Sequence, residues 1–278
     1  MHHHNHYYGQ AHLLARYCGA DEAAPPPIPG YLQHGWNVFD GWNPQHEFYP
    51  GAWRFVWSDA PRRRGYQLGR REYRVIGAPW AYLLAMEPDL GVVPEEEREG
   101  TIFFLFHGWE GGKITGEHAR LVDEIKDTEP GPITMSLYYT EYERPEVRES
   151  YEDAGFRVVC FGKRGWNYED TNVTFLYHQL REFRRHRRVA SNRLSTAVFY
   201  GASVGCQPAV YGDPMELAGE DRAFGGNARV ARLWPELHGK DLVLADVEPT
   251  VRAELGIDAV LTPDELNLLF GWDHYGKR

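Results

Sequence analysis

Cysteine is scarce in this sequence. The three cysteines, Cys18, Cys160 and Cys206, are far apart, and no two form a Cys-x-x-Cys arrangement. An odd number at such spacing argues against both a disulfide framework and a zinc ribbon. We therefore expect reduced cysteines that serve as packing residues.

Long apolar runs are also absent. No stretch approaches the roughly 18 to 20 apolar residues that a membrane-spanning helix needs. The N-terminus is polar and rich in histidine, without the charged and then apolar pattern of a signal peptide. We expect a cytoplasmic protein with no transmembrane segment. The opening MHHHNH is either native or part of a tag, and we leave it out of the candidate site.

Positive charge is in the minority. Lysine and arginine number 30 against 40 acidic residues, so the formal net charge is −10. This balance argues against binding to nucleic acid, because neutralising phosphates requires net local positive charge. An anionic ligand would need a local basic pocket.

Several motifs of known chemistry are missing. The sequence has no Gly-x-Ser-x-Gly elbow, no Gly-x-Gly-x-x-Gly fingerprint and no His-Glu-x-x-His helix. It also has no Asp-x-Asp pair of the kind that holds a divalent cation on a diphosphate. We expect no metal and no separate cofactor, so that cations and helix dipoles would hold any bound phosphate.

The chain is nevertheless long and apolar enough for a substantial core. Its 278 residues, 42% of them hydrophobic, suggest two domains at roughly 150 residues each. Short apolar runs alternate with amphipathic segments after the Pro, Gly and acid-rich stretch 86–100, which predicts a parallel sheet covered on both faces. We predict an α/β protein with two Rossmann-like domains: a reduced N-terminal domain at 1–95 and a C-terminal domain at 96–278.

Two of the predicted strands end in the same triplet, His-Gly-Trp. The first triplet begins at His34, the last residue of the run at 30–34. The second begins at His107, the last residue of the run at 101–107, and includes Gly108. In a doubly wound sheet, ligands bind beyond the carboxyl ends of the strands. An imidazole there can exchange a proton near neutral pH. The alternative is that each histidine bonds a loop carbonyl and each tryptophan packs.

Two further segments could hold phosphate. The strand in CFGKRGW runs into Lys163 and Arg164, which place two cations at a strand end, although a solvated turn is the alternative. The segment VASNRLSTAVFYGASVG predicts a strand followed by a helix start. A helix N-terminus carries unpaired NH groups and partial positive charge. Four polar residues lie there: Ser191, Asn192, Ser195 and Thr196. Simple capping by one of them is the other interpretation.

Two basic tracts, 61–71 and 181–188, are by default solvated faces, with contact to an anionic acceptor or a membrane surface as a minority alternative.

Near the C-terminus, Thr262, Pro263 and Glu265 predict a helix start with a capping box.

Together these motifs resemble metal-independent glycosyltransferases of the GT-B fold, in particular polysialyltransferases and the glycerophosphate polymerases of teichoic acid. The element QHGW is similar to a His-Gly pair whose histidine is thought to be the base in that family, which implies this role for His34. The segment SNRLSTAVFYGASVG resembles the element that holds donor phosphates, and RVIGAPWAYL the link between the two domains. The N-terminal half is shorter than a usual acceptor domain.

The resemblance implies inverting transfer of a sugar from a nucleotide-sugar donor to a hydroxyl of a small molecule or glycan. His34 would be the general base, and the donor phosphates would contact His107, Gly108, Lys163, Arg164 and the four polar residues named above. The two histidines would open on one cleft between the domains. Two other functions stay open: a nucleotide-sugar epimerase or hydrolase, and a non-catalytic nucleotide-sugar binding protein.

Overall fold

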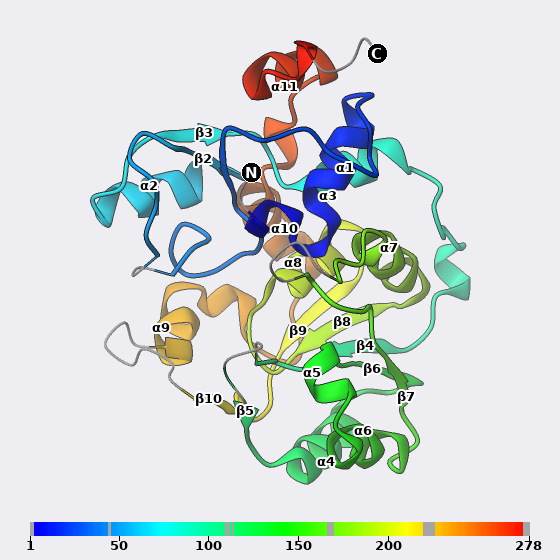
Figure 1. Ribbon diagram of the computed structural model, residues 1–278. Helices are drawn as coiled ribbons and strands as arrows, with labels where there is room; N and C mark the ends of the chain where they lie inside the picture. Colours follow the sequence, from blue (N-terminus) through cyan, green and yellow to red (C-terminus); the bar gives the residue numbers. More distant parts are fainter. Residues whose placement is uncertain are drawn as a thin grey trace. The chain divides into compact units, whose positions relative to one another are not determined.

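The computed structural model describes residues 3–43, 46–108, 112, 114–165, 170–218 and 226–274. Two compact units divide the chain (Figure 1). The first comprises Met1–Leu90, Lys163–Tyr177 and Thr250–Arg278, and the second comprises Gly91–Gly162 and His178–Pro249.

The first unit is built on a small parallel sheet. Its strands β1 (Gly30–Leu32), β2 (Trp53–Val56) and β3 (Tyr73–Val75) pair in sequence order. The helical elements that lie wholly in this unit are η1 (His3–Gly9), α1 (Gln10–Tyr17), α2 (Asp59–Gln67), α3 (Pro79–Met86), η5 (Ile257–Ala259), α11 (Pro263–Phe270) and η6 (Trp272–His274). Phe55 and Val56 of β2, the central strand, are fully buried.

The N-terminal segment completes the edge of this sheet. Asn5 is fully buried, and its side chain accepts from the backbone NH of Leu32 at 2.8 Å and donates to the carbonyl of Gly30 at 2.9 Å. The amide therefore satisfies backbone groups of β1 that a further strand would otherwise pair. Residues 3–9 are thus part of the folded unit.

The second unit contains a five-stranded sheet in which all neighbouring strands are parallel, in the order β7-β6-β4-β8-β9. The strands are β4 (Thr101–Phe104), β6 (Ile133–Ser136), β7 (Arg157–Val159), β8 (Arg188–Ser191) and β9 (Gln207–Val210). The short strands β5 (Ile114–Thr115) and β10 (Glu216–Leu217) pair antiparallel beside it.

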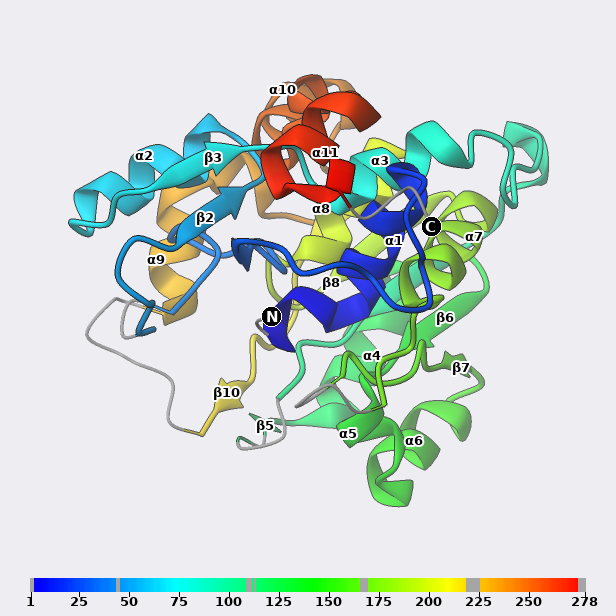
Figure 2. The same cartoon turned by 45° about the horizontal axis from the view of Figure 1, so that its top comes forward.

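Helices cover both faces of this sheet, as Figures 1 and 2 show. On one side lie α4 (His118–Thr128) and α6 (Pro145–Glu152), and on the other lie α7 (Phe175–Arg185) and α8 (Thr196–Ser203). Every residue of β4 and β6 is buried, as expected for strands covered on both faces. The remaining elements are η2 (Glu95–Glu97), α5 (Tyr139–Tyr142), α9 (Gly226–Leu233), η4 (Pro235–Leu237) and α10 (Leu244–Leu255), whose last residues belong to the first unit.

The strand order reverses once in the second unit. From β4 the chain adds β6 and β7 on one side, and it then returns to add β8 and β9 on the other. Ligands of open α/β sheets bind at such a reversal, outside the carboxyl ends of the two strands that flank it. The loops after β4 and β8 are therefore where this fold favours a ligand.

The predicted fold class is confirmed: the chain is α/β, with parallel Rossmann-like sheets and a smaller sheet in its N-terminal part. The domain ranges 1–95 and 96–278 stay a prediction, and the compact units differ from them in three segments, at 91–95, 163–177 and 250–278. Residues of Lys163–Tyr177 and Thr250–Arg278 make most of their contacts with the first unit. The capping box of Thr262 and Glu265 is confirmed at the start of α11.

Candidate functional site

The loops that flank the reversal are tied together by Asn192. Its side-chain oxygen accepts from the NH of Phe106 after β4 at 2.7 Å, and its amide nitrogen donates to the carbonyl of Asp213 after β9 at 2.8 Å. Asn192 is almost fully buried. Both ends of its amide are engaged within the protein, so the residue holds the loops after β4, β8 and β9 in place.

Arg193 supports the same arrangement, and sequence reasoning missed it. Its guanidinium lies 3.8 Å from the ring centroid of Phe106 and donates to the carbonyls of Pro214 and Met215. The side chain is buried. Its position directly after Ser191 and Asn192 could have marked Arg193 as a site residue. A basic residue in a loop is usually exposed, however, so its burial was not predicted.

His107 is exposed in the loop after β4, with its ring 4.4 Å from that of Tyr138 after β6. Its Nδ1 lies 2.6 Å from the carbonyl oxygen of Gly108. A carbonyl only accepts, so this contact places the hydrogen on Nδ1 and leaves Nε2 as the acceptor nitrogen of the neutral ring. His107 therefore bonds a loop carbonyl, as the alternative interpretation expected. The same bond orients the imidazole.

Gly108 is held between two groups. Its NH donates to Oε1 of Glu141 at 3.3 Å, and a Cβ at this position would lie 2.1 Å from the carbonyl oxygen of Gly112. Only glycine permits that approach. Glu141 is buried, and its second oxygen accepts from Thr140 at 2.6 Å. Sequence reasoning missed this carboxylate, although it lies within the turn that follows an apolar strand.

The three predicted hydroxyl residues lie between the end of β8 and the start of α8. Ser191 is buried, and its hydroxyl accepts from the NH of Arg193 at 3.3 Å. Ser195 is the N-cap residue, but its side chain does not cap the helix, and its buried Oγ has no hydrogen-bond partner within the described residues. Thr196 is the first helical residue and is half-buried. The interpretation that Ser195 is present simply as a cap is therefore wrong.

In the first unit, His34 follows β1. Its carbonyl accepts from the side chain of Gln10 at 3.0 Å, and its ring lies 5.2 Å from Tyr7 and 6.3 Å from His4. Its Nδ1 is buried with no hydrogen-bond partner in the part of the chain described. The opening residues His4 and Tyr7 therefore lie near the candidate base.

Burial lowers the pKa of His34 to about 3, and the charges of Arg164 and His46 act in the same direction. The imidazole is therefore neutral at neutral pH, with an available lone pair but low basicity. The expectation that a general base has a pKa near the operating pH does not hold for His34.

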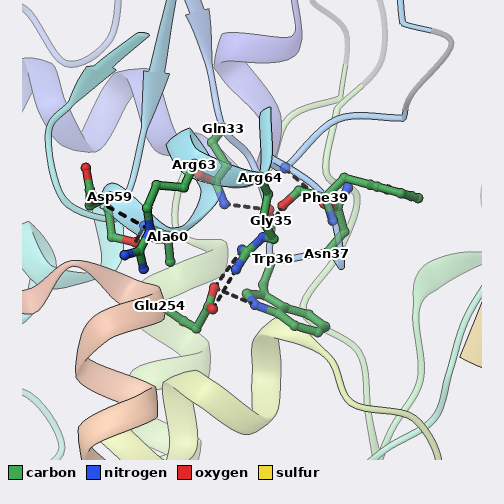
Figure 3. A network of polar contacts seen from close by, with 12 residues as sticks. Gln33, Gly35, Trp36, Asn37, Phe39, Asp59, Ala60, Arg63, Arg64 and Glu254 are labelled. Carbon is green, nitrogen blue, oxygen red and sulfur yellow. Dashed lines mark hydrogen bonds and ion pairs between the residues drawn. The ribbon is translucent and has the colours of Figure 1, made fainter. Parts of the chain in front are cut away.

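Trp36, the last residue of the first triplet, is fastened by a buried ionic network (Figure 3). Its indole NH donates to Oε2 of Glu254 at 2.9 Å, and two guanidinium nitrogens of Arg64 contact the same carboxylate at 2.7 Å each. Glu254 is 5% exposed. On the other side of His34, the side chain of Gln33 donates to the carbonyl of Gly35 at 3.1 Å and accepts from the NH of Trp57 at 3.0 Å. The loop is therefore held on both sides of His34.

Lys163 and Arg164 contact residues of the first unit. The Lys163 amine lies 3.1 Å from Oδ2 of Asp170, and the Arg164 guanidinium lies 4.6 Å from the ring centroid of Tyr7. Their strand, β7, is at the edge of the sheet, and β6 separates it from β4. The reversal thus gathers His107, Gly108 and the polar residues that follow β8. Lys163 and Arg164 belong to the first unit, and their predicted phosphate role stays a prediction.

Trp109 of the second triplet and Trp166 of CFGKRGW lie outside the described residues. Among the residues described, no group of three or more His, Cys, Asp or Glu side chains is arranged to hold a metal ion. Within the same part of the chain, no helix is both long and apolar enough to cross a bilayer.

No protein-family model matches this sequence, and no curated protein matches it. Among solved structures, it is similar to Anabaena Alr3699/HepE in complex with UDP and glucose, at 14% identity and a TM-score of 0.32, over 80% of this chain and 63% of that one. It is also similar to a variant of Os79 from O. sativa in complex with UDP, at 13% identity and a TM-score of 0.32, over 74% of this chain and 46% of that one. This chain thus spans less than two thirds of the length of either.

Proposed function

We propose that this protein transfers a sugar from a nucleotide-sugar donor to a hydroxyl group, with inversion and without a bound metal. The observation that carries the proposal is the reversal of strand order between β4 and β8. Exposed His107 follows the first of these strands, and the start of α8 follows the second. A diphosphate is suited to a helix N-terminus at such a reversal.

Ser195 supports a donor site at this point. A buried hydroxyl without a hydrogen-bond partner costs stability unless something else satisfies it. Its Oγ has no partner in the described chain, and it belongs to the residue that begins α8. A phosphate oxygen would accept from this hydroxyl and from the first NH groups of the helix.

His107 would stabilise the leaving phosphate through Nε2. Since Nδ1 is committed to the carbonyl of Gly108, protonation of the ring would place a donor hydrogen and a positive charge on the side of Nε2. Charge developing on the leaving diphosphate would favour that protonated form. Asn192 would act indirectly, by holding the loops in position.

His34 would be the general base for the acceptor hydroxyl. In the neutral ring one nitrogen carries a lone pair, and the network of Gln33, Trp36 and Glu254 restrains the loop that carries it. A base with a pKa of about 3 is weak. We infer that a bound anionic substrate raises this pKa, because a nearby negative charge stabilises the imidazolium.

The test is a thermal-shift titration with a panel of nucleotide sugars. A donor present at about 100 times its Kd adds about 2.7 kcal/mol to the free energy of unfolding. Ser195→Ala is expected to reduce the shift, whereas Ser203→Ala, at the other end of α8, is the matched control and leaves it unchanged. If no member of the panel raises the melting temperature, or if both variants respond alike, the donor site is not at the start of α8.

The products formed from the donor distinguish the alternative functions. Release of free nucleotide or an altered sugar without an acceptor indicates a hydrolase or epimerase. Retained donor affinity without turnover, unaffected by His34→Ala, indicates a non-catalytic binding protein.

A further inference from the structure

Arginines and aromatic rings alternate over one part of the first unit, around α2 and the N-terminal ends of β2 and β3. We call this region the arginine–aromatic surface; its residues are Phe48, Tyr49, Arg54, Arg62, Tyr66, Leu68 and Arg71. In Figures 1 and 2, α2 and β3 lie beside each other within this unit.

The contacts run continuously across this surface. The guanidinium of Arg54 lies 4.1 Å from the ring centroid of Phe48, and one of its NH groups donates to the carbonyl of Arg71. Arg71 lies 5.2 Å from the ring of Tyr66, and Arg62 lies 5.9 Å from the same ring. The guanidiniums are therefore held in place by rings and carbonyls.

The segment that forms this surface contains more basic than acidic residues. Residues 53–74 contain seven arginines and two acidic residues, Asp59 and Glu72, in a protein whose net charge is −10. The ion pairs of four of these arginines are as follows: Arg64 with Glu254, Arg70 with Asp40, and Arg62 and Arg63 with Asp59.

Arg54 and Arg71 form no ion pair within the described chain, and their hydrogen bonds go to backbone carbonyls. The carboxylates of Asp40 and Glu72 act on Arg54 only as nearby charges. Two fixed cations are thus left without a bound counter-charge.

Apolar side chains project beside these cations. Tyr49 is 76% exposed, Tyr66 44% and Leu68 36%. Aromatic and aliphatic side chains surrounded by arginines are typical of surfaces that lie at the headgroup level of a bilayer, where cations meet phosphates and apolar side chains reach the acyl boundary.

We propose that the arginine–aromatic surface docks on an anionic lipid bilayer. A single-stranded nucleic acid fits less well, because it binds by stacking bases on open ring faces, and guanidinium groups already lie over Phe48 and Tyr66. The proposal goes beyond sugar transfer and does not depend on it.

The second basic tract, in and after α7, serves as an internal contrast. Arg185 pairs with Glu182, Arg187 donates to the carbonyls of Arg98 and Glu96, and Arg188 pairs with buried Glu129. Ion pairs and hydrogen bonds within the fold therefore involve several of its five arginines, the same number as in the tract 61–71.

The experiment is co-sedimentation of the full chain with vesicles of phosphatidylcholine alone or with about one third phosphatidylglycerol. Each arginine at an anionic surface contributes roughly a fivefold gain in partitioning, so Arg54→Gln/Arg71→Gln is expected to weaken binding about 25-fold. The charge-matched control, Arg181→Gln/Arg185→Gln, is expected to bind like the parent. Melting temperatures of all variants show whether each is folded.

A second variant, Tyr66→Ser/Leu68→Ser, keeps every arginine and tests the apolar contribution. It is expected to bind anionic vesicles more weakly and to bind long-chain polyphosphate like the parent. Absence of binding to anionic vesicles, equal binding to neutral ones, or equal losses in the two arginine pairs would overturn the proposal. Binding to polyphosphate but not to vesicles would assign the surface to a soluble polyanion.

Discussion

His34 carries the clearest pH dependence at the scale of single residues. Its pKa of about 3 in the folded protein lies below the roughly 6.5 of an unfolded chain. As the pH falls below 6.5, the unfolded chain takes up a proton that the folded protein does not. The contribution of His34 to stability is therefore complete above 6.5 and is lost as the pH falls toward 3.

The first prediction follows from this sign. Between pH 7 and pH 5 the parent protein is expected to lose up to about 2 kcal/mol more unfolding free energy than His34→Gln, which lacks the titrating ring. Urea unfolding at both pH values measures the difference. A parent and a variant with parallel pH dependence would show that the ring is protonated as easily in the folded protein as in the unfolded chain.

The second prediction separates the two histidines. Loss of a general base lowers the rate about a hundred to ten-thousand fold, so His34→Ala is expected to reduce kcat by that order with nearly unchanged donor affinity. His107→Ala is expected to weaken donor binding, because its side chain would contact the leaving phosphate. Calorimetry with the donor and steady-state kinetics test both. If His34→Ala weakened donor binding and His107→Ala lowered only kcat, the roles assigned to the two histidines would have to be exchanged.

At the scale of elements, α10 stabilises the His34 loop through one carboxylate. The third prediction is that Glu254→Ala destabilises the protein by about 3–5 kcal/mol, because it leaves the Arg64 guanidinium partly buried without its partner. It also removes the acceptor of the Trp36 indole. Glu248→Ala, an exposed glutamate of the same helix, is the control and is expected to change stability by less than about 0.5 kcal/mol. Chemical denaturation measures both; equal effects would mean that the network contributes little.

Local patterns predicted most of these elements. The run at 101–107 predicted β4, because strands buried on both faces are continuously apolar. The capping box predicted the start of α11, because its residues lie within one turn and need no distant partner. By contrast, Ser195 lies at a helix start but does not cap, since its Oγ makes no bond to the helix NH groups.

At the scale of the whole molecule, the proposed chemistry needs no divalent cation. The fourth prediction is that turnover survives EDTA and gains nothing from added magnesium or manganese. Its basis is the missing Asp-x-Asp pair and the phosphate-binding groups proposed at the start of α8. Activity assayed after dialysis against chelator tests this. Loss of turnover that magnesium restores would contradict it.

The sequence by itself determined the alternation of strands and helices, the helix caps and the strand ends that carry His34, His107 and Asn192. These properties depend on the period of apolar residues and on neighbours within a few positions. For the same reason it placed candidate residues on both loops that flank the strand reversal.

Only the tertiary structure decided which distant groups meet. Trp36 and Glu254 are 218 positions apart, yet they share a hydrogen bond, and Asn5 bonds β1 from 27 positions away. Lys163 and Arg164 follow a strand of the second unit but belong to the first, where the guanidinium of Arg164 lies over the ring of Tyr7. Such pairings depend on how the whole chain packs, which no local period encodes. The low pKa of His34 has the same origin, because burial by residues from several segments, and not the identity of its neighbours in sequence, disfavours the charged ring.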